Sequence, residues 1–124
     1  MSKILKFAKG YIITVRSHEN DGDNTKQQTI HVDTLEKVYA IVELLKTFKT
    51  SSFSNCYDFD DDEQQEFYNF INSFDEKYET LLGQKCSHIL RKVGLTDTEW
   101  MTREINEYTV EHIEEDVYVS VITV

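Results

Sequence analysis

Apolar residues recur at helical spacing in the central stretch of the chain, Tyr57–Leu82. Steps of three and four residues place these positions on one side of a helix; they are Phe67, Phe70, Ile71, Phe74, Tyr78, Leu81 and Leu82. Asp60, Asp61 and Asp62 stand where this helix would begin, and Gly83 follows its last apolar residue. Acidic residues stabilise the start of a helix and glycine commonly ends one. The stretch therefore predicts a helix with one apolar face and one strongly acidic face.

Two further helices are predicted on either side of it. Asp33 and Glu36 form an acidic cap pattern, and the apolar residues that follow at helical spacing predict a core helix; they are Leu35, Val38, Tyr39, Ile41, Val42, Leu44, Leu45 and Phe48. Cys86, Ile89, Leu90 and Val93 predict a third, short helix that ends at Gly94. The capping pattern at 96–99 predicts one or two more helical turns, through Trp100 and Met101.

Alternating apolar and polar residues predict strands near both ends of the chain. Residues 4–17 form the first strand, in which Gly10 marks a bulge or the true strand start. Residues 28–32 form the second strand, and the turn residues at 20–24 join the two as a hairpin. The terminal segment VYVSVITV, 117–124, is strongly strand-like. Residues 101–113 fit both a helix and a strand, but a hairpin turn at Glu114–Asp116 would favour strand for 107–113.

The order ββααα(α)ββ predicts an α+β fold in which helices pack on one face of an antiparallel sheet of about four strands. A length of 124 residues, 40% of them hydrophobic, suits one domain spanning 1–124 with a single core. The terminal strand has two largely apolar faces. We therefore expect a monomer in which residues 117–124 lie inside the sheet, beside the first strand.

The charge is unevenly distributed along the chain. Its net value is −10, beyond the range of about 2–8 that suits the solubility of a small domain. Residues 53–79 contain nine Asp and Glu and one Lys, and residues 97–116 contain eight and one Arg. Residues 83–95, between these two acidic blocks, contain three basic residues and no acidic one. The acidic blocks are therefore the most informative functional feature of the sequence.

Acidic faces that carry Tyr and Phe can imitate the charge spacing of a phosphate backbone and compete for a cationic groove. The leading hypothesis is a non-enzymatic binding protein that blocks a basic nucleic-acid-binding or nuclease partner. The predicted partner-binding residues are Asp58, Asp60, Asp61, Asp62, Glu63 and Glu66, with Glu111, Glu114, Glu115 and Asp116. Direct binding of nucleic acid is disfavoured, because phosphates attract clustered Lys and Arg and are repelled by a net negative domain.

A calcium site is not predicted. Asp58, Asp60 and Asp62 copy the first three ligand positions of a calcium-binding loop. Glu63 stands where that loop needs a glycine, and Asn69 stands where it needs a bidentate glutamate. The aspartates at 21 and 23 fail the same template.

Zinc and catalytic sites are not predicted either. Cys86 and His88 could be joined by Cys56 or His112, but the spacing of a zinc site is missing. The chain has no glycine-rich phosphate loop and no nucleophile elbow. A pairing of Cys56 with His88 stays open, although buried, unreactive cysteines are the commoner case. We therefore expect no metal, no cofactor and no enzymatic activity.

Targeting signals and membrane segments are missing from the sequence pattern. No run reaches the roughly 18 apolar residues that a membrane helix needs, the N-terminal stretch does not read as a signal peptide, and two cysteines suit reduced thiols. These features predict a cytoplasmic protein.

In its short, acidic and proline-free composition the chain resembles small phage inhibitors of host defence nucleases and bacterial toxin-immunity proteins. This resemblance implies an inhibitor of another protein. Two other classes stay open. One is a small structural or assembly protein that forms a homo-oligomer through an exposed strand edge such as 117–124. The other is a small metalloprotein or enzyme.

Overall fold

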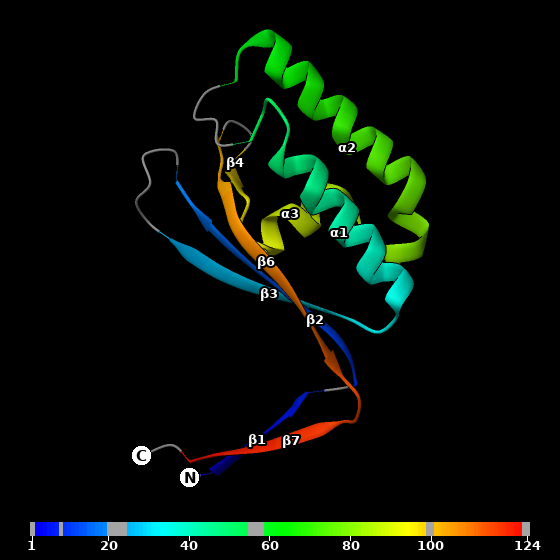
Figure 1. The fold of residues 1–124 in the computed structure, drawn as a ribbon, viewed down its shortest axis with the longest axis vertical. Helices are drawn as coiled ribbons and strands as arrows, with labels where there is room; N and C mark the ends of the chain where they lie inside the picture. Colours follow the sequence, from blue (N-terminus) through cyan, green and yellow to red (C-terminus); the bar gives the residue numbers. More distant parts are fainter. Residues whose placement is uncertain (1, 8, 20–24, 55–58, 99–100, 123–124) are drawn as a thin grey trace.

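A computed structural model describes residues 2–7, 9–19, 25–54, 59–98 and 101–122. The elements in chain order are β1 (Ser2–Phe7), β2 (Gly10–His18), β3 (Lys26–Val32), α1 (Leu35–Lys49), α2 (Asp61–Leu82), α3 (Cys86–Lys92), β4 (Thr96–Thr98), β5 (Met101–Thr102), β6 (Glu104–Ile113) and β7 (Val117–Ile122). The three helices lie on one side of an antiparallel sheet with strand order β3-β2-β6 (Figure 1). The predicted α+β class, with helices on one face of an antiparallel sheet, is confirmed.

Strand β2 is the centre of this sheet. It pairs with β3 from Tyr11↔Val32 to Ser17↔Lys26, which confirms the predicted hairpin; the residues of its turn, 20–24, lie outside the described part. On its other side β2 pairs with β6, so the strand predicted for 107–113 is also confirmed. Ile13 and Val15 are fully buried beneath the helices, because side chains two residues apart share one face of a strand.

Helix α1 buries only part of its apolar surface. Val38, Ile41 and Phe48 are buried, whereas Leu35 is 45% exposed and Tyr39 66% exposed. The apolar positions cover more than half of the circumference of the helix, so they cannot all face the core. The predicted places of Leu35 and Tyr39 in the core stripe are wrong. Thr34, not the predicted acidic residue, is the N-cap, because its side chain accepts a hydrogen bond from Lys37 N.

Helices α2 and α3 follow the prediction closely. Asp60 is the N-cap of α2, and Gly83 ends the helix with a φ of 71°. Gly94, with a φ of 77°, follows α3. Phe53, in the loop before α2, is buried among aromatic rings: its centroid lies 5.1 Å from that of Phe67 and 5.7 Å from that of Phe48. This cluster joins α1 to the N-terminal half of α2.

The additional helix predicted around Trp100 is wrong, because the chain forms the short strands β4 and β5 on either side of residues 99–100, which lie outside the described part. Contacts with distant parts of the chain, at Leu95 and Thr102, outweigh the capping pattern at 96–99 that favours a helix. Leu95 is fully buried, and its carbonyl accepts a hydrogen bond of 2.9 Å from Arg103 N. The buried Thr102 hydroxyl donates to the carbonyl of Phe53. These bonds require the chain to turn back sharply.

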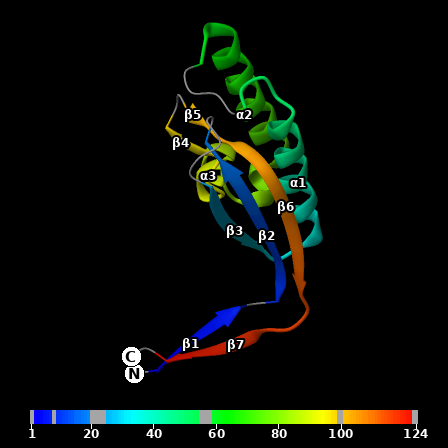
Figure 2. The same cartoon turned by 60° about the vertical axis from the view of Figure 1, so that its left-hand side comes forward.

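The terminal strand lies beside the start of the predicted first strand, as expected, but the expectation that it lies inside the sheet is wrong. β7 pairs with β1 from Ser2↔Ile122 to Phe7↔Val117 in a separate two-stranded ribbon. The predicted strand 4–17 is accordingly divided into β1 and β2, with Gly10 as the true start of β2. The ribbon leaves the sheet at a steep angle (Figure 2), and residues 114–116 connect two strands with different partners instead of closing a hairpin.

The bend between sheet and ribbon has an identifiable cause. Gly10 adopts a φ of 142°, which residues with a side chain rarely reach. Opposite it, Asp116 Oδ1 accepts a hydrogen bond of 2.8 Å from Lys9 N.

Among the described residues, no helix is both long enough and apolar enough to cross a membrane.

Candidate acidic binding surface

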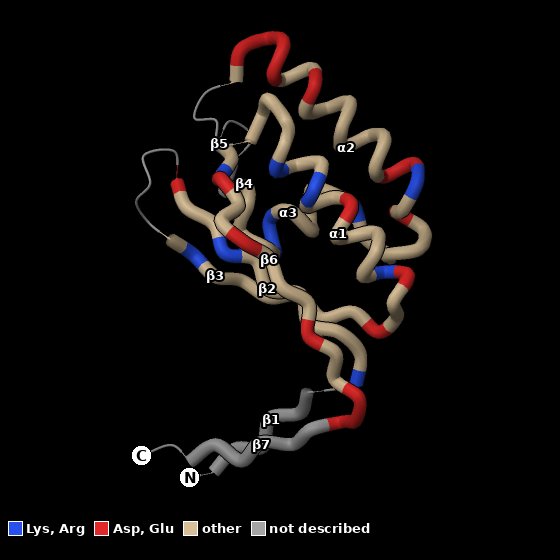
Figure 3. Tube along the Cα trace, viewed as in Figure 1, with Lys and Arg blue, Asp and Glu red and all other residues tan. Residues whose placement is uncertain are grey.

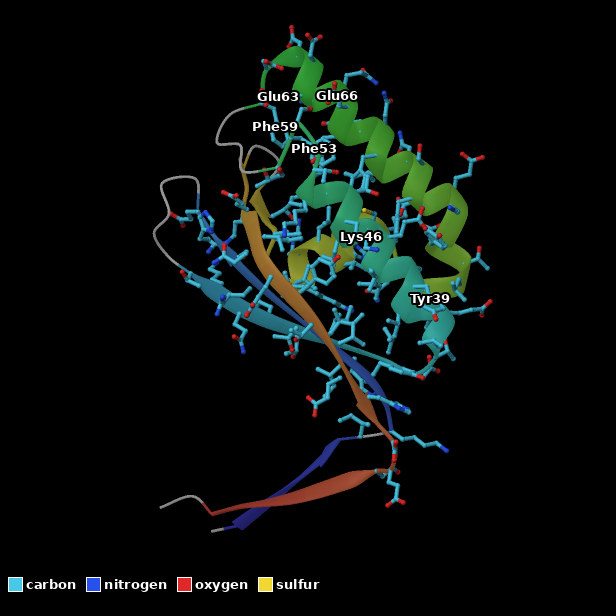
Figure 4. The ribbon with its side chains drawn as sticks, viewed as in Figure 1. Tyr39, Lys46, Phe53, Phe59, Glu63 and Glu66 are labelled. Carbon is cyan, nitrogen blue, oxygen red and sulfur yellow. The ribbon has the colours of Figure 1, made fainter. Side chains whose placement is uncertain are left out.

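Five carboxylates gather where α2 begins. These residues, Asp60, Asp61, Asp62, Glu63 and Glu66, are called here the α2 acidic end. The Asp60 side chain accepts a hydrogen bond of 2.7 Å from Glu63 N, and Glu63 Oε1 accepts one of 3.2 Å from Asp60 N. The Ser52 hydroxyl donates to Glu66 Oε2. Figure 4 shows Glu63 and Glu66 above the loop that carries Phe59 and Phe53.

The charge of the α2 acidic end is left largely uncompensated. Asp60, Asp61, Asp62 and Glu66 are exposed. Within the described part of the chain, none of these four carboxylates forms an ion pair, and the hydrogen-bond donors that reach Asp60 and Glu66 are neutral. The N-terminal end of a helix carries a partial positive charge that favours anions. It therefore stabilises this cluster without cancelling its external field.

An aromatic cluster fixes the position of the α2 acidic end. Phe59 precedes the N-cap, and its ring centroid lies 5.3 Å from that of Phe67. Phe67 in turn packs against Phe53, which is 3% exposed. The helix start that carries the carboxylates therefore packs on a partly buried aromatic cluster.

The second acidic block lies elsewhere. Glu111, Glu114, Glu115 and Asp116 are exposed and follow β6 toward the ribbon. Glu114, Glu115 and Asp116 follow the end of β6, next to the ribbon, and Figure 3 shows this end of β6 far from the start of α2. The structure therefore separates the predicted partner-binding residues into two groups, and Asp58 lies outside the described residues.

Other carboxylates of the second acidic block, residues 97–116, have side-chain partners. Arg16 NH2 lies 3.3 Å from Glu107 Oε1, and His18 Nε2 lies 3.1 Å from Glu104 Oε2. Asp116 accepts the hydrogen bond from Lys9 N that closes the bend. The α2 acidic end is consequently the stronger candidate for recognition of a cationic partner.

The candidate metal and catalytic residues are not brought together. No group of three or more His, Cys, Asp or Glu in the described ranges could hold a metal ion. His31 pairs in register with Ile12, so it does not face His18 across the hairpin. His112 stacks on Tyr11 with ring centroids 4.6 Å apart.

Cys86 is a structural residue in this fold. The side chain is fully buried, and this burial, followed by the nearby Asp75 carboxylate, strongly raises the pKa of the thiol. A protonated, inaccessible thiol is a poor nucleophile. Its suggested ligand partner His88 is exposed, and Cys56 lies outside the described residues.

Sequence reasoning missed a polar cluster in the cavity between α1 and α2, which has a volume of about 440 Å³. Lys77 Nζ lies 3.1 Å from Glu43 Oε1, and the Tyr78 hydroxyl donates to Glu43 Oε2. These two hydrogen bonds, with that from Tyr78 first, lower the pKa of Glu43. More than 30 residues separate the partners along the chain, so no local sequence signal could have linked them.

Sequence reasoning also missed Arg103, which is fully buried. Its Nε donates to Ser17 Oγ at 3.0 Å, and NH2 donates to the Ser17 carbonyl at 3.2 Å. NH1 lies 3.5 Å from Glu19 Oε1. These contacts hold the start of β6 against the end of β2, so the role of Arg103 is structural.

Comparison with known proteins gives no relative: no family model, curated protein or solved structure matches the chain. The function must therefore be argued from the charge, burial and geometry of its own residues.

Proposed function

We propose that this chain is a non-enzymatic acidic binding protein that acts in the cytoplasm. It blocks the cationic groove of a nuclease or other nucleic-acid-binding protein, as an inhibitor or nucleic-acid mimic. The observation that carries the proposal is that four carboxylates of the α2 acidic end, those of Asp60, Asp61, Asp62 and Glu66, are exposed and form no ion pair in the described part of the chain. Charges arranged in this way steer a cationic partner and accelerate association.

The proposal assigns different parts to the two acidic blocks. The α2 acidic end makes the close contacts with the partner. The predicted residues of the second block follow β6 toward the ribbon, away from the start of α2 (Figure 3), so they add to the negative field of the molecule. Inside the cell that field acts over a Debye length of about 8 Å. Direct contact with both blocks would require a partner that spans the body.

The test is a set of binding kinetics. Affinity capture from a cell lysate first identifies a basic partner, and surface plasmon resonance then measures its association and dissociation rates at about 50 and 500 mM salt. The Debye length falls from roughly 14 to 4 Å over this range, so we expect association to slow steeply. Asp60→Asn, Asp61→Asn and Asp62→Asn combined should slow association about tenfold or more at low salt, because exposed charges act mainly on the on-rate.

The triple variant should keep its fold, because Asn caps a helix about as well as Asp. The matched control replaces Glu111, Glu114 and Glu115 with Gln, which removes the same net charge from the other end of the body. We expect a much smaller effect from this control. The proposal is refuted if the folded Asn variant associates at the wild-type rate at low salt, or if both triple variants slow association equally.

A specific observation also favours the second candidate function, assembly as a homo-oligomer. In the described part of the chain the ribbon consists of β1 and β7, so each of these strands has an open edge there. An isolated two-stranded ribbon is marginally stable in water, and open edges readily pair with other strands. Edge pairing with a second copy of the chain would complete the ribbon.

A further inference from the structure

A groove between α2 and α3 differs in character from the rest of the protein. Its volume is about 440 Å³, within the range of small-molecule sites, roughly 300–1,000 Å³. Gln64, Tyr68, Ile71 and Asp75 line it from α2, in steps of three and four residues that define one helix face. The residues of α2 that line the cavity with α1 belong to a different face. The two hollows are therefore separate.

The interior of the α2–α3 groove is apolar. Phe67 and Leu90 line it and are buried, and Phe59 packs on the Phe67 ring. Tyr68 also lines the groove but is 46% exposed. An exposed tyrosine ring beside an apolar floor offers a flat surface on which another planar ring can stack.

Two cations complete the groove, Lys85 before α3 and Arg91 in its last turn. Both are exposed, and within the described residues neither forms an ion pair. The carboxylate that lines the groove, Asp75, accepts a hydrogen bond of 2.7 Å from Cys86 N. In the cavity between α1 and α2, by contrast, Lys77 is already paired with Glu43. The α2–α3 groove is thus a locally basic site in a chain of net charge −10.

We propose that the α2–α3 groove binds a small anion in which a planar ring is joined to a phosphate, the chemical class of nucleotides. The ring stacks on Tyr68 above the apolar floor, and the amides of Gln64 and Asn72, which also line the groove, can donate to and accept from its edge. The phosphate lies between Lys85 and Arg91, because guanidinium and ammonium groups bind phosphate oxygens well. The groove shares Phe59 and Phe67 with the support of the α2 acidic end, but it uses none of those carboxylates and does not rest on the proposed function.

Calorimetry and amide chemical-shift mapping test the proposal with adenosine monophosphate, adenosine and inorganic phosphate as probes. We expect the nucleotide to bind at least about tenfold more tightly than adenosine or phosphate alone, since only the nucleotide uses both halves of the site. Its largest shifts should fall on residues of the groove. Arg91→Gln should weaken nucleotide binding about tenfold, and Tyr68→Ala should abolish the advantage over inorganic phosphate.

Lys46→Gln is the matched control, because it removes one exposed positive charge from α1, outside the groove. It should leave nucleotide binding unchanged. Thermal unfolding followed by circular dichroism verifies that each variant is folded. Three results would overturn the proposal. They are adenosine monophosphate that binds no more tightly than phosphate, equal losses of nucleotide affinity in Arg91→Gln and Lys46→Gln, and an acidic peptide that binds the groove more tightly than the nucleotide does.

Discussion

At the scale of single residues, Gly10 and Gly83 show that two glycines with positive φ can be required for different reasons. Both have positive φ, 142° and 71° respectively. A Cβ atom on Gly10 would lie 2.5 Å from the backbone oxygen of Val32, whereas a Cβ on Gly83 would meet nothing within 4 Å. A glycine is therefore required at position 10 for both its backbone conformation and its close packing, and at position 83 for its backbone conformation alone.

This difference predicts the effects of two matched substitutions. Gly83→Ala should lower the free energy of unfolding by about 1 kcal/mol, the cost of a left-handed conformation for a residue with a side chain. Gly10→Ala should cost more than about 2 kcal/mol, because the backbone oxygen it meets cannot rotate away. Urea denaturation measures both values. Equal losses in the two variants would contradict the close approach at the bend.

Some single-residue features could be predicted from the sequence and others could not. The acidic N-cap Asp60 and the glycine that ends α2 were predictable, because both act through their own helix terminus. The exposure of Tyr39 was not, because α1 carries more apolar residues than the core can accept. Arg103 was not predictable either, since its burial depends on Ser17 and Glu19 at the far end of another strand.

At the scale of elements, helix predictions held where an apolar periodicity supported them, even over the seven residues of α3, and failed where a capping pattern stood alone. Helix α2 has 22 residues of consistent pattern, and its bounds followed from the sequence. The segment 96–101 has only a capping pattern, and buried contacts of Leu95 and Thr102 decided its conformation instead. The same holds for the candidate site. The clustering of the α2 acidic end was predictable because its residues are neighbours in one helix start, but the distance of the second acidic block from it depends on the topology of β6.

The contact between α1 and α2 predicts a pH dependence of stability. Hydrogen bonds from Tyr78 and Lys77 lower the pKa of Glu43 below its ordinary value of 4.5. A lowered folded-state pKa means that the stabilisation is complete above about pH 4.5 and is lost as the pH falls through the folded-state value. Glu43→Gln should therefore destabilise the protein at pH 6–7, and its difference from wild type should shrink below about pH 4.5.

Urea denaturation at several pH values provides the measurement. Glu36→Gln is the control, because it removes an exposed carboxylate from the first turn of the same helix. The difference between this control and wild type should show a weaker dependence on pH. A Glu43→Gln deficit that is equally large at pH 3.5 and pH 7 would show that the carboxylate does not act through its charge.

At the scale of the whole molecule, the two candidate interaction surfaces lie far apart. The α2 acidic end and the ribbon of β1 and β7 are at opposite ends of the fold (Figure 1). Self-association through the ribbon would therefore leave the α2 acidic end accessible to a cationic partner. The two candidate functions are compatible, and a dimer would present two acidic ends.

The monomer was expected because the terminal strand was predicted to lie inside the sheet, and the open ribbon removes this reason. We now expect the chain to form a dimer at high concentration, with twice the 14.6 kDa mass of one chain, because pairing of strand edges satisfies backbone groups that the ribbon leaves open. Light scattering after size-exclusion chromatography measures the mass across a range of concentrations. Val119→Lys, in β7, should shift the protein to monomer, since charged residues on edge strands oppose pairing. Tyr39→Lys, at an exposed position of α1, is the control and should leave the dimer intact. A mass of one chain at every concentration, or dissociation by both variants alike, would remove the ribbon as the assembly surface.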